Sequence, residues 1–232
     1  MEEIIRVENL SKKYGRNIVF EKLSFTIEKG RFVGLIGKNG LGKTTLLGIM
    51  GGFMKPNSGD VYYEGKHSSH KTQQIITLPE IDELYQDFTV QMLINYFSDL
   101  FSDFNRECAM KLREELHLNA KVKFRKLSKG MKERVCLLLT LSRKGKLYLF
   151  DEPFSGLDPN IKVEIKQIIL KNLPDNATII MSTHLLKEFE LLFDQIMILN
   201  QDGVTIRDCD EIRGNHGKTI ESFYLEETTI KQ

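Results

Sequence analysis

Short apolar runs separated by turn residues dominate the first part of the chain. Residues 4–7, 23–27 and 31–36 are rich in β-branched, aromatic and leucine residues, and the segments Lys13-Tyr14-Gly15 and Glu28-Lys29-Gly30 separate them. This pattern predicts strands joined by turns. After its first residue, the third run lacks polar alternation, which is typical of a parallel strand buried on both faces.

The remaining apolar runs lie on either side of a helical stretch. From about Ile81 to Lys144 glycine is nearly absent, and apolar residues such as Leu112 and Leu116 recur at helical spacing. The runs that predict further strands are 60–63, 75–78, 146–150, 177–181, 195–199 and 204–206. The pattern therefore predicts an α/β fold into which a helical subdomain, about 81–144, is inserted.

A glycine-rich segment follows the buried run that ends at Ile36. Residues 37–44 fit the phosphate-loop pattern G-x-x-x-x-G-K-[ST], and residues 45–50 predict the start of a helix. In such a loop, backbone N–H groups and the helix N-terminus bind phosphate; Lys43 would reach the β- and γ-phosphates, and the Thr44 hydroxyl would bind Mg²⁺. The alternative is a glycine-rich turn that matches by chance. The candidate residues are Gly37, Lys38, Asn39, Gly40, Leu41, Gly42, Lys43, Thr44 and Thr45.

Two carboxylates, Asp151 and Glu152, follow the apolar run 146–150. Because that run is apolar throughout, it predicts a buried strand whose end opens at the crevice of an α/β sheet. There Asp151 would hold Mg²⁺ and Glu152 would face an attacking water. The alternative is a pair of acids that close a surface strand.

Two more side chains have both a structural and a functional interpretation. His184 follows the run 177–181; it is either a structural histidine or a group beside the phosphate site. Tyr14 precedes Gly15 and is either a half-buried turn aromatic, which is the favoured interpretation on sequence alone, or a platform on which a purine stacks.

Composition narrows the choice of partner and compartment. Lys plus Arg total 33 and Asp plus Glu total 32, so no strong overall charge attracts nucleic acid or anionic lipid. The three cysteines, Cys108, Cys136 and Cys209, are widely spaced, which indicates neither a disulfide framework nor a zinc site and favours a reducing compartment. No apolar run approaches the roughly 20 residues that span a bilayer, so any membrane-spanning part must come from another chain.

Two weaker patterns are better explained without a ligand. The segment His67-Ser68-Ser69-His70 has no third metal ligand nearby, so we expect a solvated loop. The basic stretch 121–126 contains one aromatic residue and would suit nucleic acid or lipid head groups, but a solvated connector is favoured.

Taken together, the motifs resemble those of the nucleotide-binding subunit of an ABC transporter over nearly the whole chain. Residues 37–44 resemble the Walker A loop, and 147–151 resemble Walker B, with Glu152 in the place of the catalytic glutamate. Residues 127–131 resemble the signature sequence, and 155–158 resemble the D-loop. His184 stands in the place of the switch histidine, and Tyr14 in that of the adenine-stacking aromatic.

The resemblance implies a fold and an activity. The chain 1–232 is expected to be one ABC ATPase domain, with a RecA-like core and an antiparallel β-subdomain in about 1–80 and 145–232. ATP and Mg²⁺ are the implied cofactors, and hydrolysis of ATP to ADP and phosphate is the implied reaction. Lys43, Glu152 and His184 are the implied catalytic residues, whereas Thr44, Asp151 and Glu80 are the implied metal ligands.

It also implies partners. The signature residues would contact the ATP of the opposite subunit, so that ATP is sandwiched in a homo- or heterodimer; they are Ser128, Lys129, Gly130 and Met131. Ser155 and Asp158 would act in the D-loop. The dimer would power a separate membrane-spanning permease from the cytoplasmic face of the membrane, and no nucleic acid is expected as a partner.

The chain departs from the family pattern at three positions. Lys129 and Met131 replace a glycine and a glutamine of the usual signature, while Ser128 and Gly130 keep its hydroxyl and its close backbone approach. Glu80 stands where the family has the glutamine of its Q-loop, and it adds negative charge near the γ-phosphate. The altered signature weakly favours an export or immunity-type transporter over an importer.

Four other functions fit less well. An ABC-type ATPase that acts on nucleic acid or ribosomes usually has a long coiled-coil insertion or two ATPase domains, whereas this chain has one of each motif and an insertion of only about 60 residues. A GTPase should contain an Asn-Lys-x-Asp sequence, which is absent here. A small-molecule kinase would not need the signature. A nucleotide-binding switch without turnover would not need Glu152 and His184.

Overall fold

The computed structural model describes residues 2–67, 74–154, 159–216 and 218–229. The chain divides into two compact units, and each is described by itself. The first unit comprises Met1–Thr72, Leu149–Glu152 and Thr178–Gln232, and the second comprises Gln73–Tyr148 and Pro153–Ala177.

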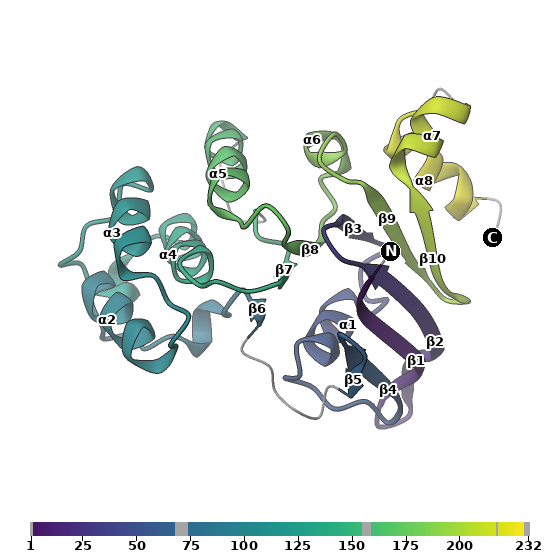
Figure 1. Ribbon diagram of the computed structural model, residues 1–232, viewed down its shortest axis with the longest axis horizontal. Helices are drawn as coiled ribbons and strands as arrows, with labels where there is room; N and C mark the ends of the chain where they lie inside the picture. The colour runs from purple at the N-terminus through teal and green to yellow at the C-terminus, as the bar shows by residue number, and fades with distance from the viewer. Residues whose placement is uncertain (1, 68–73, 155–158, 217, 230–232) are drawn as a thin grey trace. The chain divides into compact units, whose positions relative to one another are not determined.

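An antiparallel sheet forms the N-terminal part of the first unit (Figure 1). Its strand order is β2 (Asn17–Glu28), β1 (Glu3–Tyr14), β4 (Ser58–Tyr63) and β5 (Lys66–His67). The predicted turn between the first two strands is present, but β1 continues as far as Tyr14. The long strands bury apolar residues and expose polar ones, as a sheet with one solvated face does.

A mostly parallel sheet contains the strands that lead to the candidate site. Strand β3 (Phe32–Ile36) pairs in parallel with β8 (Thr178–Ser182) on one side and with β9 (Gln195–Asn200) on the other. The antiparallel strand β10 (Gly203–Asp208) extends the sheet beyond β9, and β7 (Leu147–Asp151) lies next to β8. Every residue of β3 and β8 is buried; β3 is apolar throughout, and β8 has a polar residue, Thr178 or Ser182, only at its two ends.

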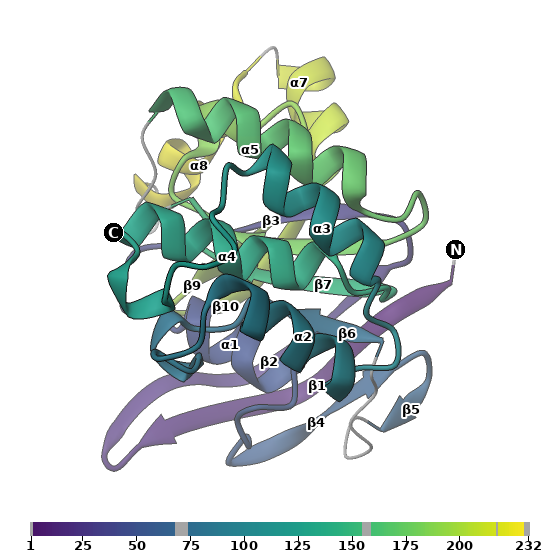
Figure 2. The ribbon, with the colours of Figure 1, turned by 90° about the vertical axis from the view of Figure 1, so that its left-hand side faces the viewer.

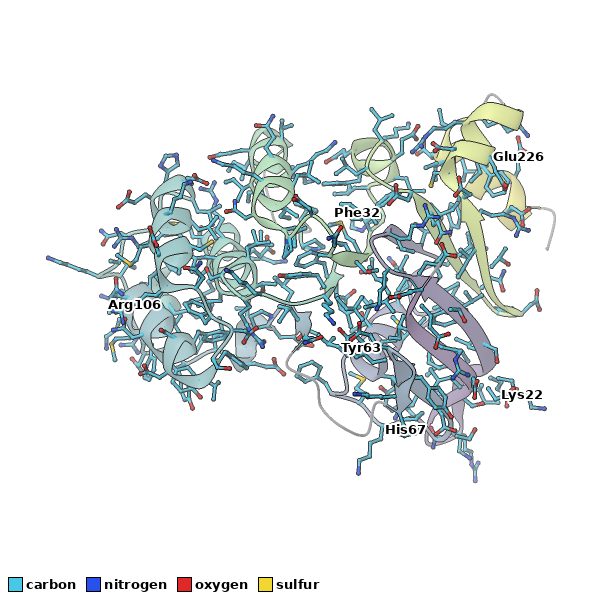
Figure 3. All side chains as sticks on the ribbon, in the orientation of Figure 1. Lys22, Phe32, Tyr63, His67, Arg106 and Glu226 are labelled. Atoms are coloured by element: carbon cyan, nitrogen blue, oxygen red, sulfur yellow. The ribbon has the colours of Figure 1, made fainter. Side chains whose placement is uncertain are left out.

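Aromatic packing fixes the start of β3. The ring of Phe32, labelled in Figure 3, meets that of Phe193 edge to face at a centroid distance of 5.5 Å. A Cβ atom on Gly34 would approach the Phe193 ring to 2.9 Å, so a larger residue there would displace the ring. The helices of this unit are α1 (Lys43–Met50), α6 (Leu186–Phe189), α7 (Cys209–His216) and α8 (Ile220–Thr229).

The second unit is mainly helical (Figure 2). Helix α4 (Lys129–Leu141) packs against α2 (Val90–Leu100) and α3 (Arg106–Glu115), and the run Val135–Leu141 of α4 is buried throughout. The start of β7 is hydrogen-bonded to the residue before β6 (Ile75–Thr77). The backbone N–H groups of Lys146 and Leu147 both donate to the carbonyl oxygen of Gln74 (2.9 and 3.2 Å). The elements are β6 (Ile75–Thr77), η1 (Ile81–Glu83), α2 (Val90–Leu100), α3 (Arg106–Glu115), η2 (Phe124–Lys126), α4 (Lys129–Leu141) and α5 (Pro159–Asn172).

The predicted fold class is confirmed, since an antiparallel sheet, a mostly parallel sheet and a helical part are all present. In the basic stretch 121–126, Phe124 is fully buried and Lys132 lies over its ring at 5.4 Å, which agrees with a connector held by its aromatic residue. The division of the chain into a core and a subdomain at 81–144 stays a prediction. In the described residues, no helix is both long enough and apolar enough to cross a bilayer.

Candidate functional site

The loop between β3 and α1 requires glycine at two positions. Gly42 has a φ of +95°, and a Cβ atom there would lie 2.3 Å from Val19 Cγ1. A Cβ atom on Gly37 would lie 2.5 Å from the carbonyl oxygen of Leu199. A side chain at either position would clash, so the two glycines let the backbone turn tightly between strand and helix.

The N-terminal end of α1 is arranged to receive an anion. Its N-cap residue, Gly42, has no side chain with which to satisfy the first N–H groups of the helix. The Lys43 side chain is buried and curls over the loop, where its Nζ donates to the carbonyl oxygen of Gly37 (2.8 Å) and, at 3.5 Å, to that of Lys38. Thr44 is exposed. The loop therefore combines a helix dipole, an ammonium group and an accessible hydroxyl.

Asp151 ends β7, Glu152 follows it directly, and a serine at the end of β8, Ser182, contacts both residues. The hydroxyl of Ser182 donates to Asp151 Oδ1 (2.5 Å) and accepts a hydrogen bond from the backbone N–H of Glu152 (2.9 Å). Glu152 has a φ of +43°, which non-glycine residues rarely adopt. Strained backbone conformations cluster at active sites, but Asn9, Lys22, Glu64 and His117 also have positive φ here, so this observation only supports the other contacts of Glu152.

His184 lies against Glu152. Its Nδ1 is 3.1 Å from Glu152 Oε2, and the His184 side chain is 56% exposed. The preceding residue, Thr183, is anchored to the sheet by its N–H bond to the carbonyl of Leu35 (3.2 Å), and its hydroxyl accepts from the N–H of Leu185 (2.9 Å). The structure thus brings two of the predicted catalytic groups into contact.

The sheet topology gathers the candidate groups. The loop follows β3, the carboxylates end β7, and His184 follows β8, and these strands lie in the order β3-β8-β7. In parallel strands the carboxyl ends meet at one edge of the sheet, where α/β proteins bind their ligands. The register pairs Leu35 with Ser182, which places the ends of β3 and β8 level with each other.

Tyr14 lies at the end of β1, and its side chain is half-exposed. Lys12 Nζ lies 4.9 Å from the centre of the Tyr14 ring, and the Tyr14 hydroxyl lies 3.5 Å from Met54 Sδ. The ring is held at its edge and on one face while half of it meets solvent. This arrangement agrees with both interpretations of Tyr14, so its contact with a purine stays a prediction.

The signature residues of the second unit form the start of α4. Ser128 is the N-cap of this helix, and its hydroxyl accepts from the N–H of Met131 (3.3 Å). Lys129 is exposed, and Gly130 and Met131 are half-buried. A helix N-terminus with small and exposed residues is suited to an anion. The contact with the opposite subunit stays a prediction.

Two further predicted groups have less structural support. Glu80 belongs to the second unit, where it is exposed at the start of η1 and its N–H donates to Glu83 Oε2 (3.4 Å). Its role as a metal ligand stays a prediction. The D-loop residues Ser155 and Asp158 lie outside the described residues.

The donor set of the first unit suits Mg²⁺. The Thr44 hydroxyl and the Asp151 carboxylate offer oxygen, and Mg²⁺ in nucleotide sites uses one or two carboxylates together with phosphate oxygens and water. Among the described residues, no group of three or more His, Cys, Asp or Glu side chains is arranged to hold a metal. His67 is instead paired with Asp60 (2.7 Å), and His70 lies outside the part that the structure describes.

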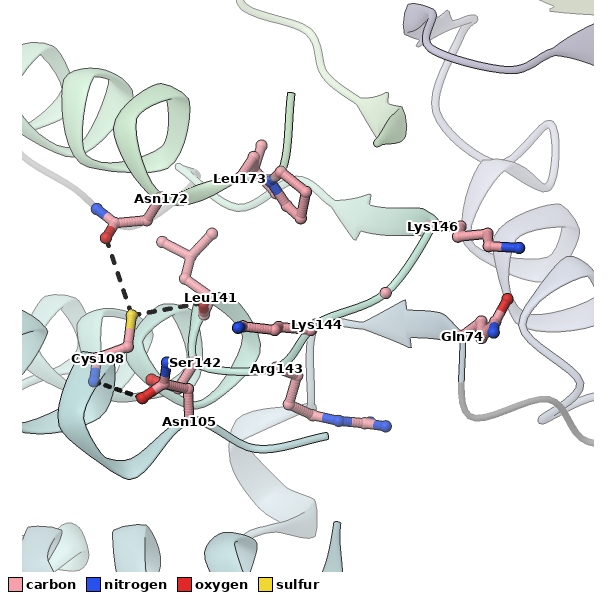
Figure 4. A pocket seen from close by; sticks show the side chains of 12 residues that line it. Gln74, Asn105, Cys108, Leu141, Ser142, Arg143, Lys144, Lys146, Asn172 and Leu173 are labelled. Carbon is pink, nitrogen blue, oxygen red and sulfur yellow. Dashed lines mark hydrogen bonds between the residues drawn. The ribbon is translucent and has the colours of Figure 1, made fainter. Parts of the chain in front are cut away.

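A separate cavity of about 550 Å³ lies within the second unit (Figure 4). It is open to solvent beside the loop that precedes β7, and it contains none of the predicted site residues. The thiol of Cys108 lies at this cavity, 3.9 Å from both the Leu141 carbonyl oxygen and Asn172 Oδ1. Burial raises the pKa of the Cys108 thiol.

Sequence reasoning did not assign a role to Ser182. The residue was visible as the polar end of an apolar run, but its partners come from a different strand. Met54 is 40 residues from Tyr14 in the chain, so its contact with the Tyr14 hydroxyl was missed because it depends on the fold. The only signal in the sequence was a small hydroxyl residue at the end of an apolar run, two residues before His184.

Fold and loop together define a nucleotide-binding protein of the phosphate-loop class. The profile of the family described as ABC transporter matches residues 20–155. The chain belongs to the ATP-binding proteins of ABC transporters, which are ATPases.

Known relatives resemble the chain over most of its length. The ABC transporter ATP-binding protein YtrB of Bacillus subtilis is 30% identical, with 95% of this chain and 77% of YtrB covered. The Nod factor export ATP-binding protein I of Burkholderia orbicola is 32% identical, with 85% and 68% covered. A solved ATP-binding subunit of an ABC transporter superposes with a TM-score of 0.83 at 28% identity, covering 97% of this chain and 99% of that one.

Proposed function

We propose that this chain binds and hydrolyses Mg·ATP as the ATPase subunit of an ABC exporter, with 1–232 working as one domain. The observation that carries the proposal is the gathering of the glycine loop, Asp151, Glu152 and His184 at one edge of the parallel sheet. Phosphoryl transfer to water asks little covalent chemistry of a protein, so positioned charges and donors supply most of the rate.

Each group of the first unit has a role in this proposal. The N–H groups of residues 37–45 wrap the phosphates, and Lys43 exchanges its carbonyl partners for the β- and γ-phosphate oxygens. Glu152 orients the attacking water or takes its proton. His184 hydrogen-bonds to the γ-phosphate and leaves Glu152, its partner at 3.1 Å, when the nucleotide arrives. Tyr14 stacks on the adenine.

Thr44 and Asp151, together with Glu80 of the second unit, hold the metal ion. When bound, Mg²⁺ neutralises charge that develops on the phosphates. The fit rests on the exposed Thr44 hydroxyl and on the Asp151 carboxylate, whose Oδ1 is already fixed by Ser182. Mg²⁺ prefers oxygen ligands, and in nucleotide sites the protein usually supplies only one or two of them.

Two partners complete the proposed machine. A second ATPase subunit, identical or related, places its signature residues (Ser128, Lys129, Gly130 and Met131 in this chain) on the opposite ATP, and Ser155 and Asp158 join that interface. A membrane-spanning permease moves the substrate while the ATPase pair lies on the cytoplasmic face. Export is supported by the relative whose name specifies Nod factor export and by the altered signature. An ATPase that acts on nucleic acid or ribosomes has no comparable support.

The variant Glu152→Gln tests the proposed role of the carboxylate. The variant should bind ATP as wild type does, and its turnover should fall roughly 100-fold or more. It should accumulate as an ATP-bound dimer, because the nucleotide is held but not cleaved. Turnover by phosphate release, ATP affinity by titration, and mass by size-exclusion chromatography with light scattering would measure these effects.

Glu21→Gln is the matched control. It makes the same neutralisation on an exposed residue of β2, and it should behave as wild type. Turnover that survives in Glu152→Gln at the control level would show that another group activates the water.

A further inference from the structure

One buried hydroxyl contacts the last residue of β7, Asp151, and the residue that follows it, Glu152. Ser182 has no exposed surface; its Oγ lies 2.5 Å from Asp151 Oδ1, and it accepts from the backbone N–H of Glu152 at 2.9 Å. A serine hydroxyl has one hydrogen to donate and two lone pairs. Because the donor and one lone pair are committed, the hydroxyl has a single orientation in which both contacts are made.

The first contact fixes the Asp151 carboxylate. A hydrogen bond from a hydroxyl to a carboxylate oxygen is a charge-assisted bond, stronger than one between two neutral groups. With Oδ1 held, the carboxylate plane cannot rotate freely. Its second oxygen is then offered to a ligand in one direction.

The second contact fixes the backbone of Glu152. The left-handed conformation of this residue is disfavoured for any side chain with a Cβ atom. Its N–H is shared between the hydroxyl of Ser182 and the carbonyl oxygen of Ser182, at 2.9 and 3.2 Å. These bonds to β8 determine the direction in which the Glu152 side chain leaves the strand.

We propose that Ser182 is a positioning residue for ATP hydrolysis, whose hydroxyl aligns the Asp151 carboxylate for Mg²⁺ and the Glu152 carboxylate for water. The inference rests on the proposed function. It adds a group outside the phosphate loop, the carboxylate pair and the histidine. Groups that orient a metal ligand without touching the metal typically contribute about 10- to 100-fold in metal affinity or activity.

The test compares two buried hydroxyls of the same strand. Ser182→Ala removes the proposed positioning group. Thr178→Val is the matched control, because Thr178 is also fully buried in β8 and its hydroxyl accepts from the backbone N–H of Gly30 (2.9 Å). Each variant loses one hydroxyl that accepts a backbone N–H, but only Ser182 contacts the Asp151 carboxylate and the backbone of Glu152.

Two measurements separate positioning from stability. The first is ADP affinity by calorimetry, in EDTA and in Mg²⁺, which needs no turnover. Ser182→Ala should bind ADP as wild type does in EDTA and should lose most of the affinity that Mg²⁺ adds. The second is steady-state hydrolysis at saturating Mg²⁺, where kcat should fall roughly 10- to 100-fold while KM for ATP stays within about twofold. Thr178→Val should retain both properties.

A third variant distinguishes loss of the hydroxyl from misfolding. Ser182→Thr keeps the hydroxyl, so it should retain the Mg²⁺-dependent gain and restore most of the turnover. If Ser182→Ala matched Thr178→Val in both measurements, or if Ser182→Thr were as impaired as Ser182→Ala while its melting temperature was unchanged, the role of Ser182 would be overturned. A wild-type chain that neither hydrolysed ATP nor gained ADP affinity from Mg²⁺ would instead overturn the proposed function.

Discussion

At the scale of single residues, the three cysteines differ in their surroundings. Cys136 and Cys209 are almost completely buried, and burial raises the pKa of each thiol to about 12. Cys108 is only half-buried, and burial raises the pKa of its thiol as well. Burial disfavours the thiolate because the low-dielectric interior solvates the charge poorly.

These shifts predict a loss of stability in alkaline solution. The unfolded chain releases its thiol protons above a pH of about 8.5, whereas folded Cys136 and Cys209 hold theirs to about pH 12. Between these values the unfolded state binds fewer protons, so the free energy of unfolding falls as pH rises, by up to about 1.4 kcal/mol per pH unit for each thiol. Below pH 8 the two thiols should contribute no pH dependence.

Urea titrations between pH 7.5 and 10.5 would measure this slope. Cys136→Ala and Cys209→Ala should each make it shallower, while Cys108→Ala is the control that should change it less. If wild type and Cys136→Ala had equal slopes over this range, the thiol of Cys136 would not be the group responsible.

At the scale of elements, three helices of the second unit begin with a side-chain cap. Thr89 caps α2 by accepting from Met92 N–H (3.2 Å), and Ser128 caps α4 by accepting from Met131 N–H (3.3 Å). Asn105 does the same for α3. Only the cap of α4 lies in a segment for which a contact with nucleotide is proposed.

This pairing allows the stabilising and functional roles of a cap to be separated. Ser128→Ala and Thr89→Ala should each lower the free energy of unfolding by about 1 kcal/mol, because each leaves a helix N–H without its acceptor. Only Ser128→Ala should weaken ATP-dependent dimerisation. Chemical denaturation gives the first quantity and light scattering at graded ATP gives the second. Equal dimerisation of the two variants would exclude the Ser128 hydroxyl from the interface.

The elements also show how far the sequence could be interpreted alone. The apolar run 32–36 and the pattern of the phosphate loop were sufficient to place a strand, a loop and a helix in order. The contacts of Ser182 could not be foreseen, because they depend on β8 lying beside β7 rather than on any local pattern. The hydrogen bonds of Lys43 to its own loop and the burial of Phe124 in a basic stretch likewise depend on the folded backbone.

At the scale of the whole molecule, the proposed groups are divided between two compact units. The phosphate loop, Asp151, Glu152 and His184 belong to the first, whereas Ser128 and the rest of the signature belong to the second. If the signature of one chain completes the site of another, a single chain has only part of the machinery for hydrolysis. ATP affinity then needs one chain, but turnover needs two.

Turnover per chain should therefore depend on protein concentration. At concentrations far below the dissociation constant of the ATP-bound dimer, the rate per chain should rise in proportion to concentration, and above that constant it should level off, because the fraction of chains in dimers follows mass action. Phosphate release would be measured over about three decades of concentration, alongside ATP affinity, which should change little. Adding excess Ser128→Ala chains at fixed wild-type concentration is the control, since these chains keep the phosphate loop but lack the signature hydroxyl, and they should restore less turnover than added wild type. A rate per chain that is the same in dilute and concentrated solution would mean that each chain hydrolyses ATP by itself.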